Sequence, residues 1–134
     1  MTYLLDTNVC IALIRRRPPP LIRRLTHHAP DSIAVSTITV AELAFGVMKS
    51  ADPEGNRAAL EQFLLPLDVV AFDAAASAAY GRVRADLERR GLGIGALDTL
   101  IAAHAASLGA TVVTNNVREF ARVPSLAVED WTIE

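Results

Sequence analysis

Short apolar runs alternate along the chain with longer segments in which apolar positions recur at helical spacing. The apolar runs predict strands over 3–5, 33–35, 69–72, 111–113 and 126–128. The helical spacing predicts helices near 8–16, 20–28, 38–50, 55–65, 74–90 and 98–108, with a short helix near 117–121. Asp73 is predicted to cap the helix after it, and Gly91 and Gly109 to end the helices before them. Because strands that are apolar throughout need cover on both faces, the alternation predicts an α/β fold with a parallel sheet between helices.

The length and composition favour one domain with an aliphatic core. The chain has 134 residues, of which 51% are hydrophobic and only 5% aromatic, so we expect a single domain spanning 1–134. Cys10 is the one cysteine, which excludes an internal disulfide, and no Cys/His spacing suits zinc. These features exclude disulfide-stapled scaffolds, zinc fingers and intrinsically disordered proteins.

The hydrophobic residues do not form a membrane segment. A membrane helix needs ~18 consecutive apolar residues, and the most apolar stretch, 33–48, is interrupted by Ser36, Thr37, Thr39 and Glu42. The first residues carry no basic region before their short apolar run, unlike a signal peptide. We therefore expect a cytoplasmic protein with no membrane partner.

Basic residues are concentrated near the N-terminus although the net charge is −2. Five positive charges and no acid lie within ten residues, at Arg15, Arg16, Arg17, Arg23 and Arg24. Arginine binds phosphate through a planar, bidentate fork, so the segment can serve a nucleic-acid backbone. A solvated helix face is the alternative that the sequence leaves open.

Polar residues directly follow two of the predicted strands. Asp6, Thr7 and Asn8 come after the first strand, and residues 114–116 (Thr-Asn-Asn) come after the fourth. In open parallel sheets, ligands bind beyond the carboxyl ends of the strands, where the strand order reverses. We therefore expect the chemistry of this protein at these two clusters.

Three carboxylates stand out from their surroundings. Glu42 lies among apolar residues on a predicted helix, where it must be paired, turned outward or functional because an unpaired buried charge is costly. Asp6 is equally explained as the N-cap of the next helix, and Asp98 as a favourable acid in the first turn of a helix. If all three meet in one pocket, their repulsion indicates a hard divalent cation such as Mg²⁺ or Mn²⁺.

Other catalytic patterns fit the sequence less well. The glycines of 91–95 lack the Gly-Lys-Ser/Thr of a phosphate-binding loop. His104 is predicted to pack or cap rather than catalyse, and His27 and His28 are predicted to be surface residues. Cys10 has no evident histidine partner, so nucleophilic catalysis is not expected.

Four motifs, in this order and spacing, resemble those of PIN-domain ribonucleases. They are 4–8 (LLDTN), 40–46 (VAELAFG), 97–104 (LDTLIAAH) and 113–120 (VTNNVREF). Over nearly its whole length the chain looks like the VapC toxins of bacterial type II toxin–antitoxin systems.

This resemblance implies a PIN-like fold, a five-stranded parallel sheet flanked by helices, and a Mg²⁺- or Mn²⁺-dependent endoribonuclease. It assigns Asp6, Glu42 and Asp98 as the metal-binding catalytic acids. Many PIN domains have Asp where this chain has Asn116, and Glu119 is the candidate substitute for the missing carboxylate. The resemblance leaves open which of the two fills the fourth position.

The resemblance also implies partners. The expected substrate is RNA, with tRNA as the first candidate, and the expected inhibitor is a VapB-type antitoxin bound to a homodimer in a larger toxin–antitoxin complex. The residues expected to support the site or to bind substrate are Thr7, Asn8, Thr114, Arg15, Arg16 and Arg17. The alternative is a PIN-fold module that binds antitoxin or RNA without cutting; the three acids oppose this alternative, and Asn116 favours it.

Overall fold

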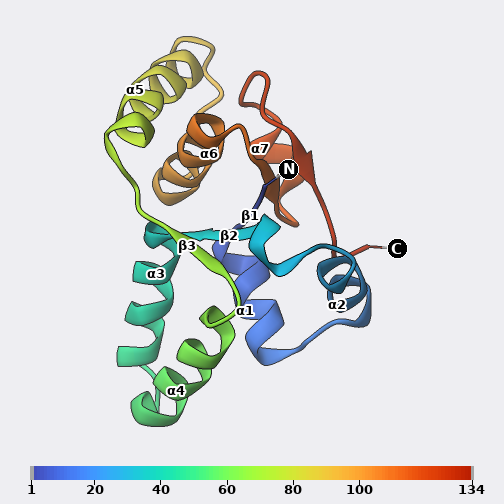
Figure 1. The fold of residues 1–134 in the computed structure, drawn as a ribbon. Coiled ribbons are helices and arrows are strands. Elements are labelled where there is room, and N and C mark those ends of the chain that lie inside the picture. Colours follow the sequence, from blue (N-terminus) through green and yellow to red (C-terminus); the bar gives the residue numbers. More distant parts are fainter. Residues whose placement is uncertain (1, 134) are drawn as a thin grey trace.

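The computed structural model describes residues 2–133 and shows the parallel sheet that the sequence predicts (Figure 1). Its strands are β1 (Tyr3–Leu5), β2 (Ile33–Ser36), β3 (Asp68–Val70), β4 (Thr111–Val113) and β5 (Val128–Glu129). All pairs are parallel, in the order β3-β2-β1-β4-β5. The chain moves outward from β1 through β2 to β3 and then crosses to β4 and β5. The order therefore reverses between β1 and β4, which is where ligands of such sheets bind.

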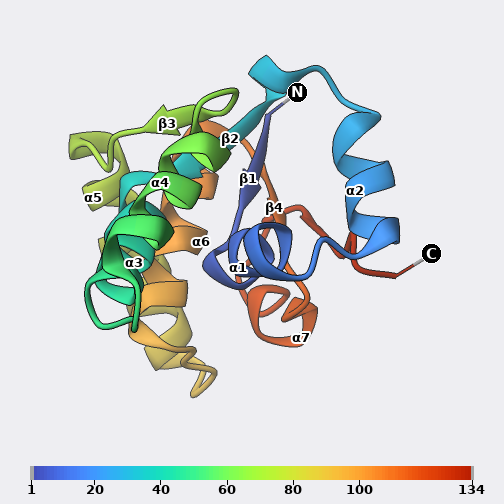
Figure 2. The ribbon, with the colours of Figure 1, turned by 90° about the horizontal axis from the view of Figure 1, so that it is seen from below.

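Helices cover both faces of this sheet (Figures 1 and 2). One face packs against α1 (Thr7–Arg15), α2 (Pro19–Thr26), α3 (Thr37–Met48) and α4 (Pro53–Leu64). The other face packs against α5 (Ala74–Arg89), α6 (Ala96–Leu108) and α7 (Val117–Phe120). A short 3₁₀ helix, η1 (Pro30–Ser32), precedes β2 and was not predicted. In residues 2–133, no helix is long and apolar enough to span a bilayer.

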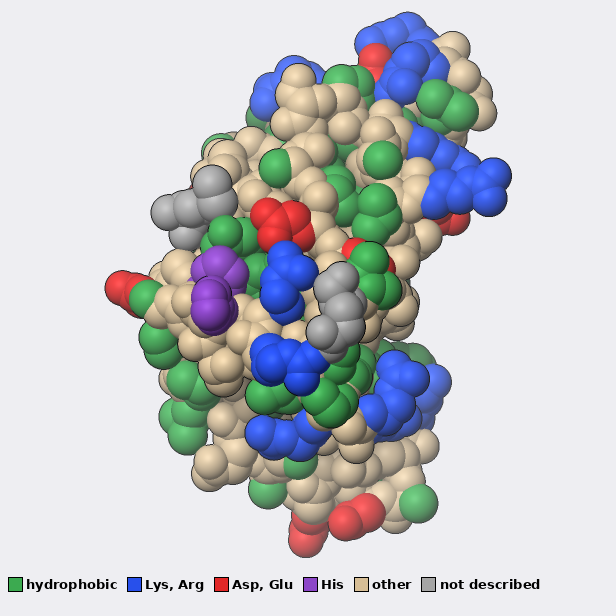
Figure 3. Space-filling model, turned by 90° about the vertical axis from the view of Figure 1, so that its right-hand side faces the viewer, with side chains coloured by type: hydrophobic (Ala, Val, Ile, Leu, Met, Phe, Trp, Pro, Cys, Tyr) green, Lys and Arg blue, Asp and Glu red, His purple; other side chains and the backbone are tan. Residues whose placement is uncertain are grey.

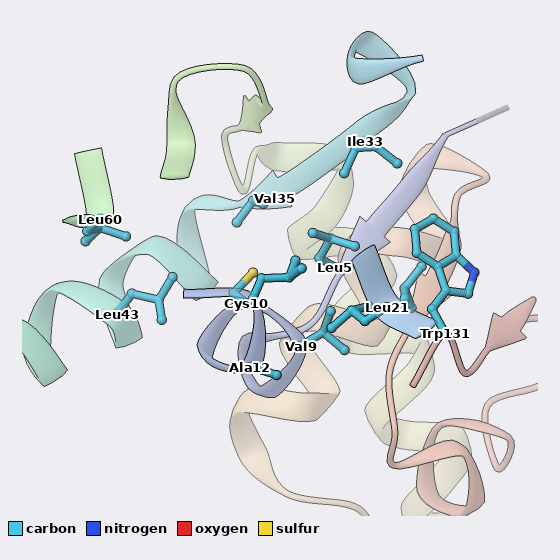
Figure 4. Packing of buried hydrophobic residues seen from close by; sticks show 12 residues of the cluster. Leu5, Val9, Cys10, Ala12, Leu21, Ile33, Val35, Leu43, Leu60 and Trp131 are labelled. Carbon is cyan, nitrogen blue, oxygen red and sulfur yellow. The ribbon is translucent and has the colours of Figure 1, made fainter. Parts of the chain in front are cut away.

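Neighbouring residues of each central strand enter opposite cores, because successive side chains of a strand point to opposite faces. Leu5 and Val113 belong to the core under α1–α4, part of which Figure 4 shows, whereas Leu4 and Val112 belong to the core under α5–α7. Leu4 also pairs with Val112 in the ladder. This alternation leaves the next residue, Asp6, at the end of β1, where its backbone N–H still donates to the carbonyl of Val113 at 3.0 Å.

The predicted N-cap of α5 and the predicted glycines after α5 and α6 are confirmed. The side chain of Asp73 accepts from the N–H of Ala76 at 3.0 Å and caps α5. Gly91 and Gly109 follow α5 and α6 with positive φ angles of 66° and 63°, the left-handed conformation that glycine adopts without strain.

The two edge strands differ from the prediction. The strand predicted over 69–72 is Asp68–Val70, because the N–H of Phe72 donates to the hydroxyl of Thr37 at 3.0 Å and leaves the ladder. The strand predicted over 126–128 is Val128–Glu129, because a turn with Ser125 at φ 62° precedes it. Edge strands are paired on one side only, so local turns set their ends.

The C-terminal segment packs onto α2 through aromatic contacts. Trp131 is fully buried, its ring stacks on His28 at 4.9 Å between centroids, and Tyr3 lies 5.1 Å away. Arg24 and Glu129 form an ion pair at 3.3 Å beside this cluster. Figure 3 shows this face, with basic side chains gathered around the histidines. His28 is thus half-buried in a stack rather than the surface residue predicted.

Candidate active site

Asp6 combines the two roles that the sequence left open. As the N-cap of α1, its Oδ1 accepts from the N–H of Val9 at 2.9 Å. Its Oδ2 accepts from the hydroxyl of Thr114 at 2.5 Å, which ties the end of β1 to the end of β4. The carboxylate is only 3% exposed and is therefore fixed in position at the reversal of strand order.

Glu42 reaches the same region from the middle of α3. Its Oε1 accepts from the hydroxyl of Thr7 at 2.6 Å, and the Thr7 hydroxyl lies 3.2 Å from that of Thr39. The side chain is half-buried, and within residues 2–133 no arginine forms an ion pair with it. Its carboxylate is therefore held by the Thr7 hydroxyl and is not paired with an arginine of the described residues.

Asp98, Asn116 and Glu119 complete the acidic region. Asp98 lies in the first turn of α6. The amide of Asn116 donates to Oε2 of Glu119 at 2.8 Å, and the backbone N–H of Asn116 donates to the hydroxyl of Thr114 at 2.8 Å. Thr114 therefore links Asp6 to the segment that carries the fourth carboxylate.

The charges of neighbouring acids affect the pKa values of Asp6 and Asp98, so these carboxylates lie near one another. Burial raises the pKa of Asp6 from 3.8 to about 6; the charges of Asp98 and Glu42 add to the rise, and the Thr114 and Val9 hydrogen bonds oppose it. Burial likewise raises the pKa of Asp98, with further contributions from Glu119 and Glu42, whereas Asn116 lowers it. We call Asp6, Glu42, Asp98 and Glu119 the acidic pocket.

The donor set suits a hard divalent cation. Every charged group of the acidic pocket offers carboxylate oxygens, which Mg²⁺ and Mn²⁺ prefer, and a cation would relieve the repulsion that raises the pKa of Asp6. Within residues 2–133, however, no three Asp, Glu, His or Cys side chains are close enough to hold one ion as they stand. A metal ion here would therefore be held by one or two of these carboxylates, with water completing its coordination.

The three consecutive arginines line three different cavities. Arg15 lines an apolar groove that also contains Glu42, Arg16 lines a cavity with Asn8 and Asn115, and Arg17 lines a third cavity with residues of α4. The backbone at the C-terminal end of α1 separates the three side chains. Arg16 is the C-cap of α1, and Arg17 takes the left-handed conformation with φ 48°, so the three side chains leave the chain in different directions.

His104 is a structural residue that links two helices of the site. It is fully buried, and its Nδ1 lies 2.8 Å from the hydroxyl of Ser36, which caps α3 by accepting from the N–H of Ile38. Its Nε2 has no hydrogen-bond partner within residues 2–133. Burial lowers the pKa of His104, while Asp73 and the Ala71 backbone act in the opposite direction. The prediction that His104 packs inside the protein is confirmed.

Sequence reasoning missed the partners of these residues. A serine directly before a helix is an N-cap signal, so Ser36 could have been identified as a cap but not as the partner of His104. Thr39 carried no signal of its own, and Asn115 was predicted only as a member of the polar cluster 114–116. Cys10 is buried, and burial raises the pKa of its thiol far above the usual range, in agreement with the absence of a nucleophilic role.

Comparisons with known proteins agree with this architecture. The family model of the PIN domain matches residues 3–126. Ribonuclease VapC2 of Rickettsia felis is 44% identical over 132 residues, and the tRNA(fMet)-specific endonuclease VapC of Salmonella typhimurium is 41% identical over 131 residues; each alignment covers 98% of both chains. The crystal structure of VapBC2 from Rickettsia felis bound to a DNA fragment from their promoter contains a chain with a TM-score of 0.93, 43% identity and coverage of 98% of this chain and 99% of that one.

PIN-domain ribonucleases are in general metal-dependent, which agrees with an oxygen-rich acidic pocket. The matches extend over almost the entire chain and include the strands that carry Asp6 and Thr114. This chain belongs to the PIN-domain family and, within it, to the VapC ribonucleases.

Proposed function

We propose that the protein is the toxin of a type II toxin–antitoxin system and cuts RNA with Mg²⁺ or Mn²⁺ in its acidic pocket. The observation that carries the proposal is the convergence of acids from distant segments on the end of β1. Asp6 directly follows β1, and Glu42, Asp98 and Glu119 lie on α3, α6 and α7. In addition to burial, the charges of Asp98 and Glu42 raise the pKa of Asp6, and the charges of Glu119 and Glu42 raise the pKa of Asp98. Capping accounts for Asp6 and the first turn of α6 accounts for Asp98, but neither accounts for Glu42 or Glu119 beside them.

The hydrogen bonds suggest a role for each acid. Asp6 and Asp98 would be the primary metal ligands, because Asp6 is fixed by two hydrogen bonds and Asp98 has a raised pKa among the other acids. Glu42 would position or deprotonate the attacking water, since Thr7 holds only one of its oxygens. A bound divalent ion would supply a water of lowered pKa and stabilise charge on the phosphate during in-line displacement.

The fourth position is best assigned to Glu119. Asn116 donates to Glu119 and so orients it, and Glu119 is the largest charge contribution to the raised pKa of Asp98. Glu119 would then supply the carboxylate that many PIN domains take from an aspartate, with Asn116 as its positioning residue.

The substrate would be RNA with an exposed, unpaired segment, because such a backbone can bend into the acidic pocket. We propose tRNA first, and tRNA(fMet) as the first species to test, because the relative from Salmonella typhimurium is named for it. Such a substrate places the activity in the cytoplasm. Arginine beside the site would bind phosphates and make the affinity salt-dependent.

The partner would be a VapB-type antitoxin, since a solved relative is a VapBC complex, and the toxin itself would be a homodimer. The apolar groove between α1, α3 and α4 leads to Glu42 and also contains Arg15 and Leu43. Phe45, which is 66% exposed on α3, leaves further apolar surface for a protein partner.

Incubation of the purified protein with tRNA(fMet) tests the catalytic proposal. Cleavage is expected with Mg²⁺ or Mn²⁺, none with chelator, and almost none for Asp98→Asn. Asp52→Asn, at the exposed N-cap of α4, makes the same change of charge outside the site and is the control. Metal-dependent binding of tRNA without cleavage by the unmodified chain would instead indicate the non-catalytic PIN-fold module.

A further inference from the structure

A second cavity adjoins the acidic pocket at the end of the sheet. It measures about 370 Å³ and lies between the start of α1, the link from α1 to α2, the residue after Thr114 and the C-terminal segment. Figure 2 views the side of the molecule where α1, α2, α7 and the C-terminus approach one another. Small-molecule sites usually measure roughly 300 to 1,000 Å³, so the cavity suits a ligand of the size of one nucleotide.

The cavity and the acidic pocket share a wall. Val9 lines the cavity while its N–H donates to Oδ1 of Asp6. Asn115 lines the cavity between Thr114, which donates to Asp6, and Asn116, which donates to Glu119. The wall of the cavity thus includes a residue that is hydrogen-bonded to Asp6, although none of the four acids lines the cavity itself within residues 2–133.

The polar groups of the cavity are available for a ligand. The side-chain amides of Asn8 and Asn115 are exposed and have no hydrogen-bond partner within residues 2–133, and over the same range Arg16 forms no ion pair. Thr132, in contrast, donates its hydroxyl to Asp130 and forms a fixed wall. Two free amides and one free guanidinium thus remain around one space.

These groups match a nucleotide. Each amide offers a donor and an acceptor, the pair of functions that base edges present, and a guanidinium offers a fork for phosphate. The cavities lined by Arg15 and Arg17 lack this combination, since each contains a single amide, Asn56 in the former and Gln62 in the latter, and the former also contains the acid Glu42. Only an unpaired base can present its edge inside such a space.

We propose that this cavity holds one unpaired nucleotide adjacent to the phosphate that is cut. Arg16 binds its phosphate, and Asn8 and Asn115 read its base, so these two amides give the enzyme a base preference next to the cleavage point. The inference rests on the proposed function, because the acidic pocket must be the place of cleavage. Arg17 has no part in this proposed site, because its side chain lines a different cavity.

Binding of labelled RNA pentamers, identical except for the central base, tests the proposal in chelator, where no cleavage occurs. Asn8→Ala and Asn115→Ala are each expected to reduce the ratio between the best and the worst central base by about tenfold. Arg16→Ala is expected to weaken all pentamers equally and to make the log–log salt slope less steep by about 0.7. Arg17→Ala loses the same charge and should have a smaller effect, and Gln62→Ala is the amide control.

The same pentamers with Mg²⁺ or Mn²⁺ separate the two proposals. If the unmodified protein binds the pentamers with a base preference but does not cut them, and Asn115→Ala removes that preference, the cavity is a nucleotide site and the proposed nuclease activity is refuted. Cleavage whose base preference survives both asparagine substitutions refutes the subsite and leaves the nuclease. Absence of binding and of cleavage refutes both. Loss of antitoxin binding by Arg16→Ala with RNA binding unchanged would assign the cavity to the protein partner and overturn the proposal.

Discussion

Replacing Asp6 by asparagine should stabilise the metal-free protein, although it removes a central residue of the site. The pKa of Asp6 is raised from 3.8 to about 6, so between these values the folded protein keeps a proton that the unfolded chain has released. The free energy of unfolding therefore falls as the pH rises through this window and is constant above it. The Asp6→Asn protein has no such loss, because the amide does not titrate.

The size of this stabilisation follows from the rise in the pKa of Asp6. A difference of about two pH units corresponds to about 3 kcal/mol at neutral pH. The amide can still cap α1 through Val9, but Thr114 loses its carboxylate acceptor, at a cost of about 1 kcal/mol. The net gain is about 2 kcal/mol. A chain of 134 residues has an unfolding entropy of about 0.3 kcal/mol per degree, so the Tm should rise by about 7 °C.

Thermal unfolding in chelator, followed from pH 4 to pH 8, measures the predicted change in Tm. The Tm difference between Asp6→Asn and the unmodified protein should be slightly negative near pH 4, rise between pH 4 and 6, and remain constant above pH 6.5. Asp52→Asn changes an exposed N-cap in the same way and serves as the control. A Tm difference for Asp6→Asn that is independent of pH, or negative throughout, would refute the idea that repulsion and burial in the acidic pocket destabilise the fold.

Three further outcomes are expected from the same geometry. Asp98→Asn should abolish most of the Tm increase that Mg²⁺ causes, which a titration followed by thermal unfolding would detect; an unchanged increase would remove Asp98 from the ligand set. Glu119→Gln should reduce cleavage at least as much as Asn116→Ala, measured as initial rates, and a small loss would return the fourth position to Asn116. His104→Leu should lower the Tm at pH 7.5 by about 4 °C through loss of the bond to Ser36. Because burial lowers the pKa of His104, the unmodified protein loses stability as the pH falls below 6.5, and the gap to His104→Leu should close there.

Periodicity predicted the central elements well because their register is set by burial. Leu4 and Leu5 of the first strand and Val112 and Val113 of the fourth are apolar and fully buried, and the structure contains both strands with the predicted limits. The helices lie within two residues of the predicted ends. The edge strands were less predictable, since the bond from Phe72 to Thr37 and the turn at Ser125 are contacts that no periodicity encodes.

The sequence identified the acids of the site but not the surroundings that decide their chemistry. Asp6, Glu42 and Asp98 were conspicuous because each lies at a strand end, on an apolar helix or in a first turn. The arginine segment was treated as one surface, whereas the end of α1 directs Arg16 and Arg17 into separate cavities. Directions of side chains beyond a helix end depend on one backbone angle, which charge composition does not reveal.

The three-residue strand β1 makes the active site unusually intolerant of insertions. Leu4 and Leu5 fill opposite cores, and Asp6 follows at once, so one extra residue within 3–5 would exchange the two cores and turn the carboxylate away from Thr114. A longer strand could absorb such a change at its far end. During the evolution of this family, insertions should therefore be excluded from β1 and tolerated in the link between α3 and α4. A deep mutational scan with single-residue insertions would measure this difference in tolerance.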